Sequence, residues 1–298
     1  MSAAKKIAQT VSVYASLIRR GPREFVDRLR VLGEIHADRR HRPQTVYQAR
    51  RWDSALKVID RYLPEIAEYA ADPRLAAFED EQRREIERFT PTAPFMHQLN
   101  ADIVLARACC LVCRVLKPRV VVETGVGYGV TSSFLLHALH NNGYGQLHSV
   151  DLPPVWPGAN RLVGVLVPER LRTRWQLHKG PSRRLLPALL AQVGRVDLFI
   201  HDSLHTYHNM LWELSIVTPY LADRAAVIVD DANENAAFAA WVTLTDPDCW
   251  MAIQQAEKRN LFGLALLVAA KTGVVARSAE PDCGWEATCY PAPIGRGM

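Results

Sequence analysis

Residues 120–129 read Val120-Val121-Val122-Glu123-Thr124-Gly125-Val126-Gly127-Tyr128-Gly129. The stretch begins as an apolar, β-branched run and ends in three glycines at alternate positions, and a helical pattern follows over Thr131–His140. Glycine lets a backbone turn sharply and approach a neighbour where a Cβ atom would collide. Because open α/β folds bind ligands at the carboxyl ends of their strands, the stretch predicts a strand, a ligand-binding loop and a helix.

The chain repeats this alternation from about residue 100 onward. The strand candidates are 119–123, 146–151, 175–179, 196–201 and 225–230, and the later helical candidates are Ser182–Val193 and Tyr207–Leu221. Short apolar strands between helices are typical of a parallel sheet that is covered on both faces. Two more apolar stretches, Trp250–Gln255 and Leu261–Val268, flank a polar turn and predict a C-terminal antiparallel hairpin. We therefore expect an α/β, Rossmann-like, doubly wound fold with a mostly parallel sheet of seven strands.

The first 98 residues differ from the rest, because their apolar residues recur at helical spacing over Pro22–Arg40 and Arg50–Tyr69. Two prolines in Thr90–Pro94 close this segment. We predict a helical N-terminal extension over residues 1–98, acting as a substrate cap or as the surface of a homo-oligomer. A second domain is expected over residues 99–298.

Composition excludes several classes of protein. Of the 298 residues, 49% are hydrophobic and 22% are charged, as in soluble globular proteins. No apolar run approaches the ~20 residues that span a bilayer, and the N-terminus does not read as a signal peptide, so we expect a cytoplasmic protein. Residues 1–60 hold thirteen Lys or Arg against six Asp or Glu, which indicates a solvated helical face or a patch for an acidic partner or an anionic membrane surface. No nucleic-acid-binding motif accompanies the net charge of +5, so no nucleic-acid partner is expected.

The spacing of the glycines distinguishes two kinds of nucleotide site. A dinucleotide fingerprint, G-x-G-x-x-G, starting at Gly125 requires a glycine at position 130, where this chain has Val130. The observed spacing, acid-x-Gly-x-Gly-x-Gly, resembles motif I of the class I methyltransferases that use S-adenosylmethionine (SAM). The resemblance implies that Glu123 orients the amino acid end of SAM and that the backbone of Gly125, Gly127 and Gly129 lies beside it. A tight turn with a purely structural role is the alternative.

Two further residues extend the predicted nucleoside site. Asp151 ends the second strand, where a carboxylate can accept two hydrogen bonds from ribose hydroxyls. A turn aspartate is the alternative interpretation of Asp151. The third strand ends near Gly180-Pro181-Ser182, where the family contacts adenine, and the resemblance assigns Ser182 to SAM binding.

Acidic residues follow the fourth and fifth strands, at Asp202 and at Asp230-Asp231. The carboxyl ends of parallel strands face one cleft, and three converging carboxylates raise one another's pKa unless a cation neutralises them. Oxygen ligands suit Mg²⁺. Residues 100–268 resemble the metal-dependent O-methyltransferases, including the catechol type and the cephalosporin-hydroxylase and macrocin group, and this resemblance makes Asp202, Asp230 and Asp231 the metal ligands. The catechol type often has Asp-Asn where this chain has Asp-Asp, whereas the cephalosporin-hydroxylase group has two acids.

A histidine stands three residues after the first of these acids. The catechol-type enzymes place a basic residue at the position of His205, where it accepts the substrate proton. Imidazole has a pKa suited to proton transfer near neutral pH. We predict that His205 is the catalytic base and that Asp202 shares in catalysis; a structural histidine is the alternative.

These residues together predict an enzyme, a SAM-dependent methyltransferase that methylates a hydroxyl of a small-molecule acceptor with the help of a divalent cation. Three alternatives stay open. The first is a metal-independent methyltransferase that acts on nitrogen or oxygen. The second is an NAD-type oxidoreductase, and the third is a SAM-binding protein without catalytic activity.

Overall fold

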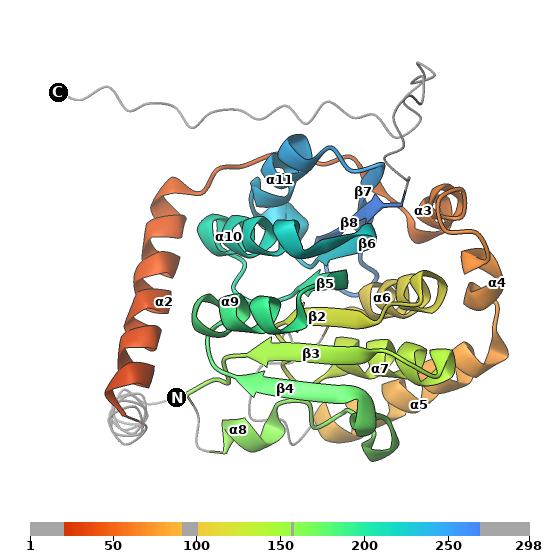
Figure 1. Cartoon of the computed structure of the whole chain (residues 1–298), viewed down its shortest axis with the longest axis horizontal. Helices are drawn as coiled ribbons and strands as arrows, with labels where there is room; N and C mark the ends of the chain where they lie inside the picture. The colour runs from red at the N-terminus through yellow and green to blue at the C-terminus, as the bar shows by residue number, and fades with distance from the viewer. Residues whose placement is uncertain (1–20, 91–100, 156–157, 269–298) are drawn as a thin grey trace.

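One sheet of eight strands forms the centre of the structure, a computed structural model that describes residues 21–90, 101–155 and 158–268. The strands lie in the order β1-β7-β8-β6-β5-β2-β3-β4, and helices cover both faces (Figure 1). The strand bounds are β1 Ala49–Arg50, β2 Val120–Thr124, β3 Gln146–Asp151, β4 Trp175–Lys179, β5 Val196–His201, β6 Leu221–Val229, β7 Cys249–Gln254 and β8 Leu261–Leu267. The predicted α/β, Rossmann-like fold is confirmed.

The α-helices alternate with the strands after residue 100, as the apolar pattern predicts. Their bounds are α2 Pro22–His41, α3 Trp52–Ile59, α4 Ile66–Ala70, α5 Pro73–Phe89, α6 Ile103–Leu116, α7 Val130–Asn142, α8 Ala159–Leu162, α9 Ser182–Val193, α10 Tyr207–Val217 and α11 Ala237–Thr245. Three short 3₁₀ helices, Glu169–Arg174, Thr218–Tyr220 and Ala232–Glu234, complete the described elements. No helix in the described ranges is long and apolar enough to cross a membrane.

The C-terminal hairpin is confirmed, and its second strand enters the sheet between two others. β8 runs antiparallel to both of its neighbours, so that Ala265 lies opposite Val227 of β6 and opposite Trp250 of β7. The remaining pairs are parallel. The parallel strands β2, β3, β5 and β6 therefore end at a common edge, where the predicted site residues stand.

The sheet gains one strand that the sequence pattern does not predict. Residues Ala49–Arg50 form β1, which pairs with the edge strand β7, although Arg50–Tyr69 reads as one helix. That stretch is also divided into α3 and α4, and Glu65 between them adopts a left-handed φ of 77°. Pro64 explains the break, because proline lacks an N–H and its ring disfavours a continuing helix.

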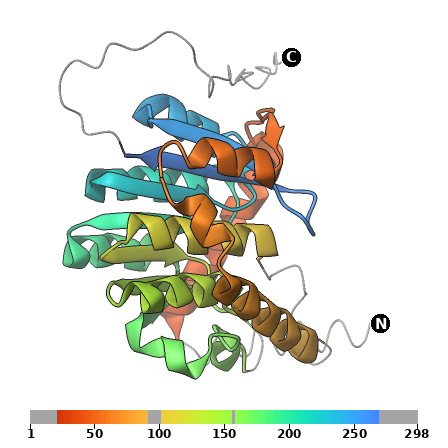
Figure 2. The ribbon, with the colours of Figure 1, turned by 90° about the vertical axis from the view of Figure 1, so that its right-hand side faces the viewer.

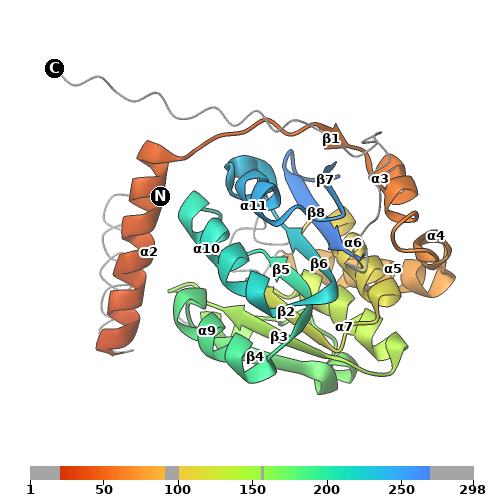
Figure 3. The ribbon, with the colours of Figure 1, turned by 45° about the horizontal axis from the view of Figure 1, so that its top comes forward.

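Alternate residues of each strand pack on opposite faces, as the pleat of a strand requires. Val121 joins a core cluster with α3 to α7, whereas its neighbour Val122 joins a cluster with α9, α10 and α11. Figure 3 shows these two helical layers on either side of the sheet, and Figure 2 shows α3, α4 and α5 lying outside α6 and α7. The N-terminal helices α3 to α5 thus share a core with the predicted methyltransferase domain, while the predicted boundary near residue 98 lies outside the described residues.

The helix α2 stands across the carboxyl edge of the sheet, beside the ends of α9 and α10 (Figure 1). Among the described residues, neither core cluster includes a residue of α2. Polar contacts hold it instead. Asp38 accepts a hydrogen bond from the backbone N–H of Tyr207 at 2.7 Å, and Asp27 pairs with Arg184 at 3.1 Å.

Candidate active site

A cavity of about 630 Å³ opens at the carboxyl ends of the parallel strands. This volume is within the usual range for small-molecule sites, roughly 300–1,000 Å³. The walls come from the glycine-rich loop after β2, the ends of β3 and β6, the loop after β5, the start of α9, the β7–β8 turn and α2. Eight of the ten predicted site residues line the cavity: Gly125, Gly127, Asp151, Ser182, Asp202, His205, Asp230 and Asp231. Glu123 and Gly129 are not among its lining residues.

The three glycines of the loop have different roles. All have left-handed φ values, 84° at Gly125, 52° at Gly127 and 95° at Gly129. A Cβ atom on Gly125 would lie 1.8 Å from the carbonyl oxygen of Asp202, and one on Gly129 would lie 2.8 Å from the Cα of Gly164. Gly125 and Gly129 are therefore required because another backbone segment packs directly against each of them. The role of Gly127 depends instead on its place in the cavity wall.

Asp151, at the end of β3, forms hydrogen bonds with the backbone of the same loop. Its Oδ2 accepts hydrogen bonds from the backbone N–H groups of Val126 at 2.8 Å and Gly127 at 3.0 Å. Burial raises the pKa of Asp151, and these two bonds oppose that effect. Asp151 is thus a loop-positioning residue that also lines the cavity, and its binding of ribose stays a prediction.

Glu123 is fully buried behind the loop. Its Oε2 accepts hydrogen bonds from the hydroxyls of Ser132 at 2.7 Å and Ser149 at 2.6 Å, whereas its Oε1 is buried without a hydrogen-bond partner. Burial raises the pKa of Glu123 to about 7, because the two hydroxyls only partly offset the lost solvation. Its assignment to the amino acid end of SAM stays a prediction, since the structure places its carboxylate behind the cavity wall.

A buried glutamate that sequence reasoning missed lies on the other side of β2. Glu213 of α10 pairs with His201 Nδ1 at 2.7 Å and accepts hydrogen bonds from Thr124 and Ser203 at 2.5 and 2.8 Å. Ser182, predicted to bind SAM, also donates to Glu213. Burial alone would raise the pKa of Glu213, but the neighbouring His201 and the hydrogen bonds lower it to about 2.

The spacing of α10 contained a signal for this glutamate. Met210, Glu213, Leu214 and Val217 recur at intervals of three and four residues, and all are buried. An acid on the apolar face of a helix predicts a buried partner, because an unpaired buried charge is costly.

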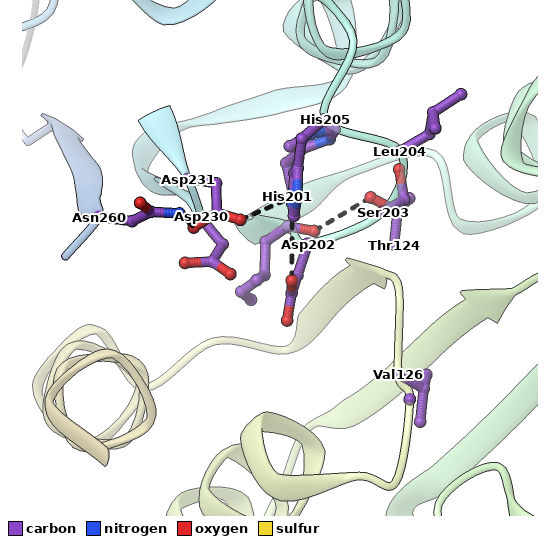
Figure 4. Close-up of polar contacts among 12 residues, drawn as sticks. Thr124, Val126, His201, Asp202, Ser203, Leu204, His205, Asp230, Asp231 and Asn260 are labelled. Atoms are coloured by element: carbon purple, nitrogen blue, oxygen red, sulfur yellow. Dashed lines mark hydrogen bonds and ion pairs between the residues drawn. The ribbon is translucent and has the colours of Figure 1, made fainter. Parts of the chain in front are cut away.

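The predicted acids converge with His205 at one end of the cavity (Figure 4). One ligand atom from each of Asp202, His205 and Asp230 lies within 4.8 Å of the others. His205 Nε2 is 3.7 Å from Asp202 Oδ1, and its Nδ1 is 3.1 Å from Asp231 Oδ2. We call Asp202, His205, Asp230 and Asp231 the acidic cluster.

Asp231, predicted as a third metal ligand, differs from Asp202 and Asp230 in the contacts of its carboxylate oxygens. Its Oδ2 faces His205, and its Oδ1 accepts a hydrogen bond from Asn260 at 2.7 Å. Burial opposes its ionisation, but the hydrogen bond and charge of His205 lower the pKa of Asp231 to about 2. Both carboxylate oxygens are therefore engaged within the protein.

The pKa values of Asp202 and His205 are both raised, although burial acts on the two groups in opposite directions. Burial, and then the charge of Asp230, raise the pKa of Asp202 well above its usual range. Burial alone would lower the pKa of His205, yet its bond to Asp231 and the nearby carboxylates raise it. The cluster therefore favours binding of a proton or another cation.

The β7–β8 turn supplies three side chains to the cluster that sequence reasoning also missed. Gln255 donates to Asp230 Oδ1, Asn260 donates to Asp231 Oδ1, and Lys258 Nζ lies 3.6 Å from Asp230 Oδ2. Burial lowers the pKa of Lys258, but Asp230 and the other acids raise it further, so the amine carries a charge. The only signal in the sequence was the polar composition of a turn between two apolar strands.

Comparison with known proteins gives a family match over part of the chain. Residues 122–232 match a family described as a methyltransferase domain. This range runs from β2 to the end of β6 and includes every predicted site residue. No curated protein matches the sequence.

Solved structures resemble this fold at low sequence identity. An O-methyltransferase from Bacillus cereus, in complex with SAH, is 11% identical and has a TM-score of 0.50, with 62% of this chain and 90% of that chain covered. The O-methyltransferase TomG from Streptomyces achromogenes, involved in tomaymycin synthesis and in complex with SAM, is 16% identical, with a TM-score of 0.48 and coverage of 73% and 97%. A methyltransferase from Geobacter sulfurreducens is 17% identical, with a TM-score of 0.46 and coverage of 67% and 98%. At these identities the similarity concerns the fold.

Proposed function

We propose that this chain, which is a class I SAM-dependent methyltransferase, transfers the methyl group of SAM to a hydroxyl oxygen of a small molecule. One observation carries the proposal. The glycine-rich loop with Asp151 and the acidic cluster with His205 line the same cavity of about 630 Å³. A cofactor site and a proton acceptor therefore face one another across a space of suitable size for two small reactants.

The SAM site is proposed at the loop side of the cavity. Gly127 lines the cavity without a side chain, and Asp151 holds the backbone of that glycine in place. Ser182 lines the next part of the wall at the start of α9. We assign the nucleoside end of SAM to Asp151 and Ser182, and its amino acid end to the glycine-rich loop.

The proton acceptor is proposed to be His205. With Nδ1 donating to Asp231, the lone pair of the ring lies on Nε2, which faces Asp202. A hydroxyl is a poor nucleophile until it loses its proton, whereas a neutral amine already has a free electron pair. A positioned base therefore supports an oxygen acceptor over a nitrogen acceptor.

The residues of the acidic cluster fit a small divalent cation. Asp202 and Asp230 offer the oxygen ligands that Mg²⁺ prefers, and Asp230 Oδ2 is buried without a hydrogen-bond partner. We propose that these two aspartates hold the cation, and that Asp231 becomes a ligand only if it releases His205 or Asn260. When bound, the cation would lower the pKa of the acceptor hydroxyl and orient its oxygen.

The chain's own residues then account for the remaining events. SAM, when bound, supplies a methyl group on a sulfonium, so that a C–O bond forms as the C–S bond breaks and the hydroxyl proton is left to be accepted. His205 accepts that proton at Nε2, and Asp231 stabilises the resulting imidazolium. The cavity walls hold the two reactants in line, an effect worth roughly 7–11 kcal/mol in well-oriented reactions.

The acceptor is proposed to lie against α2, because this helix closes the wall opposite the strand ends. Arg28, Arg30, Val31 and Glu34 of α2 line the cavity. This supports the role of a substrate cap for the N-terminal segment, while an additional role in a homo-oligomer stays a prediction. We also propose that the enzyme acts in the cytoplasm on a small molecule and without a nucleic-acid partner.

A metal-independent reaction is the second candidate, and Lys258 is the observation that favours it. An ammonium 3.6 Å from Asp230 supplies a positive charge to the acidic cluster without any ion. An NAD-type oxidoreductase is disfavoured by Val130, which interrupts the dinucleotide fingerprint, and by the antiparallel strand β8.

Calorimetry tests the cofactor assignment. The full chain should bind SAM and its demethylated product, and NAD should not bind. Gly127→Val should abolish SAM binding while the thermal transition stays cooperative, because the new side chain enters the cavity. Tight binding of NAD, or unchanged SAM binding by the variant, would contradict the assignment.

Metal dependence is tested separately with an acceptor found by screening hydroxylated small molecules. Turnover should fall in excess chelator and return with Mg²⁺ or Mn²⁺, and Asp202→Asn should lose this response while SAM still binds. Full turnover in excess chelator would support the metal-independent candidate.

A further inference from the structure

The β7–β8 turn places Lys258 against the most deeply buried acid of the cluster. Lys258 lines the cavity, and its Nζ lies 3.6 Å from Asp230 Oδ2. Asp230 is 0% exposed, and this oxygen accepts no hydrogen bond within the described structure. The ammonium is thus the group that compensates a buried carboxylate oxygen.

The turn is built to hold this lysine in place. Asp102, at the start of α6, accepts hydrogen bonds from the backbone N–H groups of Glu257 at 2.6 Å and Lys258 at 3.3 Å. Gln255 and Asn260 fasten the two ends of the turn to Asp230 and Asp231. The position of Lys258 is therefore specified by contacts on both of its sides, in contrast to a lysine at a free loop tip.

Three arginines that line the cavity pair with carboxylates outside the acidic cluster, and one of these pairs is Arg28 with Glu24 at 3.4 Å. Arg183 pairs with Glu34 at 3.4 Å and Arg184 with Asp27 at 3.1 Å, both on α2. His205 Nδ1 pairs with Asp231 at 3.1 Å, and its Nε2 lies 3.7 Å from Asp202. Lys258 is the lysine among the residues that line the described cavity; its Nζ lies 3.6 Å from Asp230, and its charge also acts on Asp202.

We propose that Lys258 is the resident counter-ion of Asp202 and Asp230 and that it competes with a divalent cation for these two carboxylates. The proposal rests on the proposed function, because it concerns the cation assigned to that site. A metal ion between the two acids would stand close to the ammonium, and like charges at such a distance repel strongly in a partly buried site. Metal binding therefore requires Lys258 to withdraw, and the lysine keeps the site neutralised and the metal affinity low.

Titration of the full-length protein with Mn²⁺, followed by calorimetry and by electron paramagnetic resonance of free Mn²⁺, tests the competition. Lys258→Met keeps the length of the side chain and removes its charge, and we expect it to bind one Mn²⁺ at least tenfold more tightly than the unmodified chain. Lys258→Arg keeps the charge and should bind no more tightly than the unmodified chain. Lys258→Gln repeats the test in case the methionine variant folds poorly.

Arg259→Met is the matched control, because it removes a positive charge from the adjacent, exposed position of the same turn. Its Mn²⁺ affinity should stay within about twofold of the unmodified chain. In an Asp230→Asn background, the gain from Lys258→Met should largely disappear, which would assign the competition to Asp230 in particular.

Equal Mn²⁺ affinities in Lys258→Met and Arg259→Met would overturn the proposal, as would weaker binding by Lys258→Met or no binding by any variant. SAM binding is measured on the same samples. Loss of SAM binding by the unmodified chain would refute the proposed function, whereas unchanged SAM binding with equal Mn²⁺ affinities would refute only the competition.

Discussion

Two histidine–carboxylate pairs lie side by side in this molecule and differ in what surrounds them. His201 and Glu213 are both 0% exposed and 2.7 Å apart, while His205 and Asp231 are 21% and 12% exposed and 3.1 Å apart. The two imidazole rings are 5.6 Å apart and nearly perpendicular. The two histidines are four positions apart in the sequence, yet His201 and Glu213 lie behind the cavity wall, whereas His205 and Asp231 line the cavity.

Whether a histidine next to a carboxylate has a structural or a catalytic role therefore depends on the other groups around the pair. Glu213 also accepts bonds from Thr124, Ser203 and Asn209, so the inner pair joins β2, the loop after β5 and α10. His205 lines the cavity, whereas His201 is not among its lining residues. We therefore expect the inner pair to govern stability and the outer pair to govern chemistry.

The largest effect is expected at the outer pair. His205→Ala should slow the methyl-transfer step by roughly 10² to 10⁴-fold, the usual worth of a positioned base, and leave SAM affinity nearly unchanged. Single-turnover kinetics with saturating SAM measure this step. His208→Ala, at an exposed position of α10, is the control and should keep normal turnover. Normal turnover by folded His205→Ala would make this histidine structural.

Removal of the inner carboxylate should instead destabilise the fold. Glu213→Leu leaves His201 and the hydroxyl and amide donors around it without their buried acceptor, and loss of one partner of a buried pair costs about 3–5 kcal/mol. Urea denaturation measures the free energy of unfolding. A loss below about 1 kcal/mol would mean that Glu213 contributes little, and the contrast between the two pairs would fail.

Acid should weaken the inner pair in a defined pH window. The pKa of Glu213 is about 2 in the folded chain and 4.5 ordinarily, so its ionised form stabilises the fold above pH 4.5, and this contribution is lost as the pH falls toward 2. The shift corresponds to about 3 kcal/mol. The stability difference between the unmodified chain and Glu213→Gln should be constant above pH 4.5 and shrink below it. A difference that stays constant down to pH 2.5 would contradict the low pKa.

The smallest effect is a change in pH dependence at the outer pair. Asp231 raises the pKa of His205, so the acidic limb of the pH–rate profile should lie above the ordinary histidine pKa. Asp231→Asn removes the carboxylate charge and should move this limb to lower pH. If the acidic limb does not move in this variant, the titration that controls the rate is not that of His205.

Four of the predicted site residues that line the cavity share one property, namely their place at the ends of strands. Gly125, Asp151, Asp202 and Asp230 each stand at or directly after the carboxyl end of β2, β3, β5 or β6, and all line the cavity. Parallel strands bring these ends to one edge, so apolar strand patterns alone suffice to bring the residues together. Glu123 belongs to the same strand end, yet its side chain points behind the loop, where Ser132 and Ser149 bind it.

The roles within that edge required the folded chain. Gly125 reads as a ligand-facing glycine, but a Cβ atom at this position would collide with the backbone of Asp202. Asp231 reads as a third metal ligand, whereas its oxygens are bound to His205 and Asn260. Side chains at one edge have several partners within reach, and only their directions show which ones they bind.

Local spacing was enough for the order of strands and helices, the glycine-rich loop and the edge at which the acids gather, because these depend on side-chain periodicity and on residues close in sequence. Other features depend on contacts between segments that are distant in sequence. These are the β1 strand, the position of α2 over the cavity, the hydrogen bonds of Glu213 and the approach of Lys258 to Asp230. Such contacts form when packing brings polar groups together away from water, where each group needs a hydrogen-bond or charge partner. A short-range sequence pattern does not identify which distant residue that partner is.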